Sequence, residues 1–375
     1  MPMKVCFIIS DFKFMISHRY SLLLEMAKLH EVIVITDLQN VSHESIASVK
    51  SNKIAMLHLQ KRAHSNVGDY LRYGKGLVQL INKVSPSHLF FVTLEISMMG
   101  GIMSRLLKVE RIFYVISGLG NFFFYKKMKY KFMRLIYYLS FQVFNKSKST
   151  KFIFQNKEDE KIFLNQKYIR GVGSMIIHGN GVVIPNIQRG PRKINANQLI
   201  FCFAGRLSVS KGFGEFITAC KAIHRDYPGI KFQIAGSCSP DTEDFFSTQF
   251  YEEIKKNNIF TLNGELPHHA MEVFFKDADI FVLPSYREGL SKAALEAAAN
   301  SLPLIVSDVP GLRECIKENG YMCRRNDAED LTKKMLEIIK NLDQLPNMGK
   351  NSKHHIQQYF SLEKISKEYL SLICK

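Results

Sequence analysis

Two cations early in the second half of the chain have the chemistry to bind a phosphorylated ligand. Arg206 and Lys211 lie in the segment 203–212, directly after an apolar run of strand length that ends at Gly205. In open parallel sheets ligands bind beyond the carboxyl ends of the strands, so we expect both cations at such an edge. A planar guanidinium beside a compact ammonium group suits a diphosphate.

Two glutamates follow a later strand in the same half. Residues 280–283 form an apolar run, Glu288 and Gly289 occupy the loop after it, and Glu296 lies in an alanine-rich helical segment. Free amides at a helix start favour anionic or polar oxygens. A carboxylate in so apolar a setting requires a partner, and sugar or ribose hydroxyls would serve. The alternative is a solvated glutamate on an outer helix face.

No metal site is predicted. Asp277 and Asp279 have the spacing of a metal-binding pair but precede a strand, so their carboxylates should lie at the opposite end of the sheet. The cysteines show no zinc-site spacing, and we expect reduced, mostly buried thiols. They are Cys6, Cys202, Cys220, Cys238, Cys315, Cys323 and Cys374.

The elements that position these residues alternate between strands and helices. Strands that are apolar on both faces indicate parallel sheets covered by helices on each side. In the first half the predicted strands are 4–10, 31–36, 88–93, 111–116 and 151–155, with a helix over 17–30. In the second half they are 199–204, 231–235, 280–283 and 304–307, with helices over 213–227 and 292–300.

The chain is too long for one hydrophobic core. With 375 residues, 46% of them hydrophobic, two domains are expected. We predict an α/β protein in which two Rossmann-like, doubly wound domains face a cleft. Their ranges are 1–187 and 188–355, with a polar linker at 188–198 and a C-terminal helix, 356–375, able to cross back to the first domain.

The positive charge is concentrated in the first half. The net charge is +17, and residues 1–190 hold 27 Lys and Arg against 11 Asp and Glu. Residues 111–157 contain ten Lys or Arg, fourteen Phe or Tyr and no acidic residue. This composition is typical of a helix in the headgroup layer of an anionic membrane. A buried aromatic helix with solvated lysines is the alternative, and nucleic-acid binding is disfavoured because no recognition motif accompanies the stretch.

No apolar run is long enough to span a membrane, and the first ten residues lack the features of a secretory signal. The sequence therefore predicts a cytoplasmic protein.

Four motifs together resemble glycosyltransferase family 4, whose members are retaining enzymes of the GT-B fold. In chain order they are Gly-Arg-x4-Lys-Gly, Ala-Asp-Ile-Phe-Val-Leu-Pro-Ser, Glu-Gly-x6-Glu-Ala, and a Pro-Leu-Ile-Val-Ser-Asp strand. The resemblance covers nearly the whole chain and is strongest over 200–312. Residues 117–120, Ser-Gly-Leu-Gly, and the basic aromatic stretch after them are similar to bacterial enzymes that extend polyprenyl-diphosphate-linked sugars.

This resemblance implies a donor site in the second domain. Arg206 and Lys211 would neutralise the departing nucleoside diphosphate in place of a metal ion, and Glu288 would hold hydroxyls of the donor sugar. The other implied donor residues are Gly205, the Gly289 and Leu290 amides near the diphosphate, and Glu296 on the ribose. The implied donor is a UDP-hexose or UDP-N-acetylhexosamine, with no cofactor beyond this co-substrate.

The acceptor side is less well matched. The family's histidine after the fourth strand has no counterpart around 93–95, where Glu95 is the candidate substitute. The remaining acceptor-side candidates are His18, Arg19, Gly118 and Gly120, although a lone histidine is more often structural.

The resemblance therefore implies a metal-independent transferase in bacterial surface polysaccharide assembly, such as O-antigen or capsule. Its expected partners are a nucleotide sugar, a polyprenyl-diphosphate-linked saccharide and, through 111–157, the inner face of the cytoplasmic membrane, without nucleic acid. The alternatives are another GT-B enzyme, either a sugar-nucleotide epimerase or a soluble-acceptor transferase, and a non-catalytic basic protein that binds membranes or nucleic acid.

Overall fold

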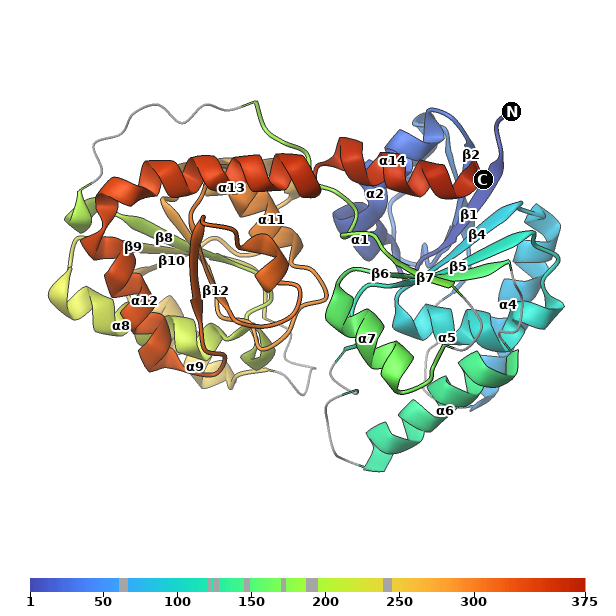
Figure 1. The fold of residues 1–375 in the computed structure, drawn as a ribbon, viewed down its shortest axis with the longest axis horizontal. Coiled ribbons are helices and arrows are strands. Elements are labelled where there is room, and N and C mark those ends of the chain that lie inside the picture. Colours follow the sequence, from blue (N-terminus) through green and yellow to red (C-terminus); the bar gives the residue numbers. More distant parts are fainter. Residues whose placement is uncertain are drawn as a thin grey trace. The chain divides into compact units, whose positions relative to one another are not determined.

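The protein consists of two compact α/β units. A computed structural model describes residues 1–60, 67–120, 123, 128–144, 149–169, 173–186, 195–238 and 245–374. Unit 1 contains Met1–Gly181 together with Leu362–Lys375, and unit 2 contains Val182–Ser361 (Figure 1). The predicted fold class, two doubly wound domains with parallel sheets, is confirmed.

Unit 1 is built on a seven-stranded parallel sheet. The strand order is β3-β2-β1-β4-β5-β6-β7. The edge strands β3 and β7 are only partly buried, which explains why an apolar run did not reveal them. The strands are β1 (Lys4–Ile8), β2 (Glu31–Thr36), β3 (Ile54–His58), β4 (His88–Val92), β5 (Arg111–Ile116), β6 (Thr150–Phe154) and β7 (Gly173–Ile176).

Helices cover both faces of this sheet and bury a separate core on each (Figure 1). On one face pack α2 (Tyr20–Ala27), α3 (His43–Ser51) and α14 (Leu362–Ile373). On the other pack α4 (Val67–Val84), α5 (Leu94–Met103), α6 (Met128–Phe144) and α7 (Lys157–Asn165). The predicted helix 17–30 begins instead with the short helix α1 (Phe12–Phe14) and a π-helical turn, Met15–Arg19, before α2.

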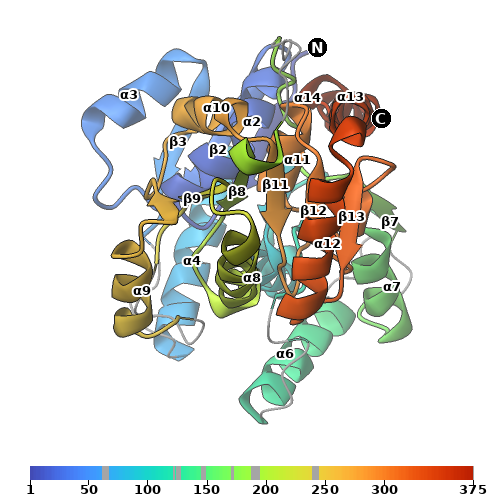
Figure 2. The ribbon, with the colours of Figure 1, turned by 90° about the vertical axis from the view of Figure 1, so that its left-hand side faces the viewer.

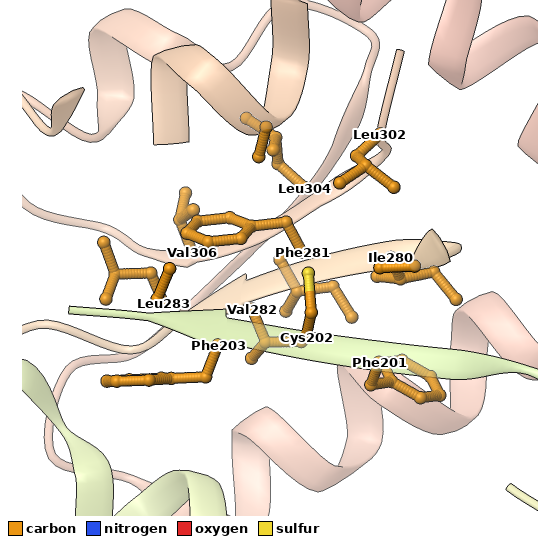
Figure 3. Close-up of a cluster of buried hydrophobic side chains, with 14 of the residues drawn as sticks. Phe201, Cys202, Phe203, Ile280, Phe281, Val282, Leu283, Leu302, Leu304 and Val306 are labelled. Atoms are coloured by element: carbon orange, nitrogen blue, oxygen red, sulfur yellow. The ribbon is translucent and has the colours of Figure 1, made fainter. Parts of the chain in front are cut away.

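Unit 2 has a six-stranded parallel sheet in the order β10-β9-β8-β11-β12-β13. The strands are β8 (Ile200–Ala204), β9 (Lys231–Ala235), β10 (Phe260–Leu262), β11 (Ile280–Leu283), β12 (Leu304–Ser307) and β13 (Gly320–Cys323). The central strands β8, β11 and β12 are almost entirely buried, and Figure 3 shows their apolar side chains gathered in the core. Burial on both faces is what the continuous apolar runs predicted.

Helices flank the sheet of unit 2 (Figure 2). The helix α8 packs against α12, and α11 packs against α13. Their bounds are α8 (Phe213–Asp226), α9 (Thr248–Lys255), α10 (His268–Asp277), α11 (Lys292–Ala299), α12 (Ala328–Lys340) and α13 (Leu345–Tyr359).

The unit boundaries differ from the predicted ranges. Val182 forms a bridge with Ser361, and its amide donates to the Phe360 carbonyl at 2.9 Å, so both segments belong to unit 2. The predicted helix 356–375 is interrupted there: residues up to Tyr359 complete α13, and α14 starts at Leu362. Residues 188–194 of the predicted linker 188–198 lie outside the described residues.

Candidate functional site

The candidate donor residues follow the two central strands of unit 2. Arg206 and Lys211 come after β8, and Glu288 comes after the adjacent β11. The chain leaves β8 towards β9 and leaves β11 towards β12, in opposite directions across the sheet. Ligands in doubly wound sheets bind at such a switch point, so the three residues occupy the expected position.

A glycine turn brings the first of these loops against the second. Gly212 precedes α8 with φ +68°, and a Cβ on it would lie 2.0 Å from the Pro284 carbonyl oxygen. Only glycine combines this backbone conformation with so close an approach. The turn therefore places Lys211 beside the loop that carries Glu288.

Lys211 and Glu288 form a direct ion pair. The Lys211 Nζ donates to Glu288 Oε1 at 2.5 Å, and the two side chains are 20% and 9% exposed. Burial, followed by the negative charge of Glu288, raises the pKa of the nearby Cys315 thiol, which therefore stays protonated. Arg206 is exposed at the same strand end. The arrangement offers an exposed guanidinium and a paired ammonium to an incoming anion.

Ser285 joins the two loops, a role that the sequence alone does not indicate. Its side chain is fully buried, and its hydroxyl lies 3.1 Å from both the Ser210 and the Arg287 carbonyl oxygens, which share its one proton. The Tyr286 amide also donates to the Ser210 carbonyl, at 2.8 Å. The serine was visible directly after Pro284, but its partners were not, because Ser210 lies 75 residues earlier in the chain.

We expect Ser285→Ala to lower the free energy of unfolding by about 1 kcal/mol, the usual contribution of one hydrogen bond. The change removes the Ser285 hydroxyl that links the two loops and leaves the hydrogen bond of the Tyr286 amide in place. Urea unfolding followed by circular dichroism measures it. The matched control is Ser371→Ala, because that hydroxyl is exposed and bonds only within its own helix. Equal stability of the two variants would show that Ser285 does not hold the loops.

The loop after Glu288 leads into α11. Ser291 is the N-cap of this helix and accepts a hydrogen bond from the Ala294 amide. The Pro-Gly turn of the next motif lies against the loop, since a Cβ on Gly311 would be 2.4 Å from the Gly289 carbonyl oxygen and 2.7 Å from that of Glu288. Gly289 and Leu290 directly precede Ser291, and the first amides of a helix have no carbonyl partner within the helix.

Glu296 has charged partners inside unit 2. The Lys292 Nζ lies 3.1 Å from Glu296 Oε1, and the His268 Nε2 lies 3.8 Å from the same oxygen. The sequence predicts ligand hydroxyls as the partners of this carboxylate, whereas the structure shows Lys292 and His268 beside it. The i,i+4 spacing of Lys292 and Glu296 was the available signal.

The acceptor-side candidates in unit 1 follow three neighbouring strands, β1, β4 and β5. His18 is exposed after β1, its Nδ1 lies 2.6 Å from Ser17 Oγ, and its ring stacks on Phe14. Glu95 is exposed in the first turn of α5, after β4. Gly118 and Gly120, both with positive φ, follow β5. These residues share the carboxyl edge of the sheet, where β1 and β4 form its switch point.

Arg19 differs from the other candidates because it is buried. Its side chain is 1% exposed, and Nη1 donates to the Tyr369 hydroxyl on α14 at 3.2 Å. Among the residues that the structure describes, its Nε and Nη2 have no hydrogen-bond partner. In this conformation the guanidinium contacts the C-terminal helix rather than solvent.

Unit 1 also contains a hollow of about 660 Å³ beside α14, which includes none of the candidate residues. Its lining includes Arg111, Lys151 and Glu368. Burial raises the pKa of Glu368, and this effect is larger than the opposing effect of the positive charge on Lys364.

Four further observations concern the described residues. No group of three or more His, Cys, Asp or Glu is placed there to hold a metal ion. None of the helices described is long and apolar enough to cross a membrane. All seven cysteines are free thiols, and five are buried. Asp279 lies at the amino end of β11, where its Oδ2 accepts from the Ile200 amide, as its position before a strand predicted.

Both halves of the chain match models of known protein families. Residues 4–156 match the family Glycosyl transferase 4-like, and residues 186–355 match Glycosyl transferases group 1.

Curated relatives include bacterial polysaccharide enzymes. A UDP-Gal:alpha-D-GlcNAc-diphosphoundecaprenol alpha-1,3-galactosyltransferase of Escherichia coli is 26% identical over 295 residues, 73% of each chain. The capsular polysaccharide biosynthesis glycosyltransferase CapM of Staphylococcus aureus is 23% identical over 218 residues, 56% of this chain and 55% of its own.

Solved structures share the fold over the whole chain. A sucrose-phosphate synthase from Thermosynechococcus elongatus aligns with a TM-score of 0.78 at 17% identity, covering 98% of both chains. Anabaena Alr3699/HepE, in complex with UDP and glucose, aligns with a TM-score of 0.76 at 14% identity, covering 100% of both.

Proposed function

We propose that the chain, whose two halves match the families Glycosyl transferase 4-like and Glycosyl transferases group 1 and which has the GT-B fold, is a retaining hexosyltransferase. It transfers a hexose or N-acetylhexosamine from a UDP sugar to a lipid-linked saccharide. The observation that carries this proposal is the Lys211–Glu288 pair at the switch point of unit 2.

The two cations stabilise the leaving group. As the bond between the anomeric carbon and the diphosphate oxygen breaks, negative charge develops on the diphosphate, and Arg206 and Lys211 neutralise it. Donor binding exchanges part of the Lys211–Glu288 contact for a contact between Lys211 and phosphate, which frees Glu288 for a sugar hydroxyl. Two cations fulfil the role that a divalent ion has in other transferases, so the reaction is proposed to be metal-independent.

The acceptor hydroxyl attacks on the face from which the diphosphate departs. A bond forms between the acceptor oxygen and the anomeric carbon, and the hydroxyl proton passes to the departing diphosphate. This geometry retains the anomeric configuration. The Gly289 and Leu290 amides bind the diphosphate beside the start of α11, and Glu296 binds the ribose in exchange for one of its contacts with Lys292 and His268.

The acceptor is proposed to carry a polyprenyl diphosphate. The support is the relative of Escherichia coli, whose name specifies a diphosphoundecaprenol-linked GlcNAc acceptor. The basic first half supports action at the inner, anionic face of the cytoplasmic membrane, as a peripheral protein. His18, Glu95, Gly118 and Gly120 are the proposed acceptor-side residues.

Donor binding is tested by thermal unfolding of the purified protein with UDP, GDP or ADP, each with and without a metal chelator. A ligand that binds only the folded state raises Tm, and a concentration of 100 Kd contributes about 2.7 kcal/mol. We expect UDP alone to raise Tm, by the same amount in the presence of chelator. A shift with GDP or ADP instead would change the proposed donor, and a shift that requires a metal would contradict metal independence.

A further inference from the structure

The helix α6 has two opposite faces with different surroundings. Its inner face carries Tyr137 and Phe141, both buried in the core of unit 1. On the same side the Ser140 hydroxyl donates to the Met98 carbonyl of α5 at 2.8 Å. These contacts fix the rotation of α6 on the unit and determine which side chains point outward.

The outer face of α6 carries an exposed apolar stripe. Met128, Phe132, Leu135 and Leu139 are 74%, 64%, 50% and 45% exposed. Their i, i+4, i+7, i+11 spacing places them on one side of the helix, over roughly 16 Å of its length. Soluble proteins commonly expose single apolar residues, but a continuous stripe of four such residues marks an interaction surface.

Cations accompany the stripe. Lys131 is exposed next to Phe132, and the turn after the neighbouring α5 exposes Leu106 together with Arg105 and Lys108. The sequence from 111 to 157 contains no acidic residue. An apolar helix face with cations beside it complements the acyl and headgroup layers of an anionic membrane.

We infer that the outer stripe of α6 inserts into the headgroup region of anionic lipid and holds the enzyme at its lipid-linked acceptor. The role of this contact in reaching the acceptor rests on the proposed function. The contact itself is inferred only from the exposure and charge of α6. It also restricts the membrane contact predicted for residues 111–157 to the outer face of α6. Phe113 and Tyr114 of β5 and Phe152 of β6 are buried in the cores of unit 1, so they are not available to lipid.

A single tryptophan can report the insertion, because the sequence contains none. Phe132→Trp places an indole on the stripe, and Leu164→Trp places one at a 46% exposed position on α7 of the same unit. With vesicles of phosphatidylethanolamine and phosphatidylglycerol, we expect a blue-shifted emission and quenching by brominated lipid for Phe132→Trp only. Equal responses of the two indoles, or no response, would overturn the inference.

Loss of binding is the complementary test. We expect Phe132→Glu combined with Leu135→Glu to reduce vesicle binding at least tenfold in flotation, which corresponds to about 1.4 kcal/mol. Leu164→Glu is the control. It adds one negative charge outside the stripe, and its vesicle binding should stay within a factor of two of that of the unchanged protein. Unchanged binding by the double variant would contradict the inference, as would sedimentation showing that the stripe joins two copies of the chain.

The Tm shift with UDP, measured on the same preparations, separates the two proposals. Normal nucleotide binding with lost vesicle binding supports the α6 contact and shows that the double variant is folded. Vesicle binding through the stripe without any nucleotide binding would leave the α6 contact intact and reject the proposed transferase site.

Discussion

Glu288→Gln is expected to lower kcat by about two to three orders of magnitude, the usual cost of removing one preorganised polar group from a transferase site. The amide still accepts a hydrogen bond from Lys211, so the fold and the turn around Gly212 should persist. What is lost is a carboxylate that can bind the donor sugar hydroxyl. Transfer of labelled sugar from UDP donors to a diphosphate-lipid acceptor measures kcat, and the Tm shift with UDP checks that the nucleotide still binds.

Two comparisons make this result specific. Glu272→Gln removes an exposed carboxylate from α10 and should leave transfer unchanged. Glu288→Asp retains the charge on a shorter side chain and should recover only part of the rate, because its oxygens no longer reach both Lys211 and the sugar. If Glu288→Gln kept at least half of the original kcat, Glu288 would have no part in the reaction.

Lys211→Met is expected to reduce kcat/KM by about two to three orders of magnitude, since the departing diphosphate loses a cation at the point where its charge develops. The same change leaves Glu288 as a carboxylate that is 9% exposed and has lost its ion-pair partner. Losing that partner should lower Tm. Nucleotide affinity and transfer rate should therefore fall together, with the larger effect on the rate.

The control for charge is Lys221→Met, which removes an exposed lysine from the middle of α8. It should leave both UDP binding and kcat/KM within a factor of two. Measurement at several salt concentrations separates local from general electrostatics, because exposed charges are screened over about 10 Å at 0.1 M salt. Equal losses for Lys211→Met and Lys221→Met would assign the effect to net charge and remove Lys211 from the site.

Local pattern was sufficient for the main features of the fold. Strands buried on both faces read as uninterrupted apolar runs, so β2, β5, β9, β11 and β12 have the predicted bounds. The edge strands β3 and β7 lack that pattern, because their residues are only partly buried. The family motifs likewise lie in short continuous segments, so the sequence alone indicates the candidate donor residues.

The contacts around those residues depend on chain segments far apart in the sequence. Lys211 and Glu288 are separated by 77 residues and meet because β8 and β11 pair in parallel, so that both strands end at one edge of the sheet. Arg19 looked like an accessible cation, yet Tyr369, 350 residues later, receives its hydrogen bond after α14 returns to unit 1.

The aromatic residues of 111–157 show the same division. Composition predicted an amphipathic element, but it could not say which rings are exposed, because burial depends on how α6 packs on α5 and on the strands that flank it in the sequence. The sequence by itself determined the central strands, the fold class and the residue types of the candidate site, since these depend on local periodicity and short motifs. The tertiary structure alone decided which of those groups meet, which are buried and which face of α6 remains open, since these depend on contacts between distant parts of the chain.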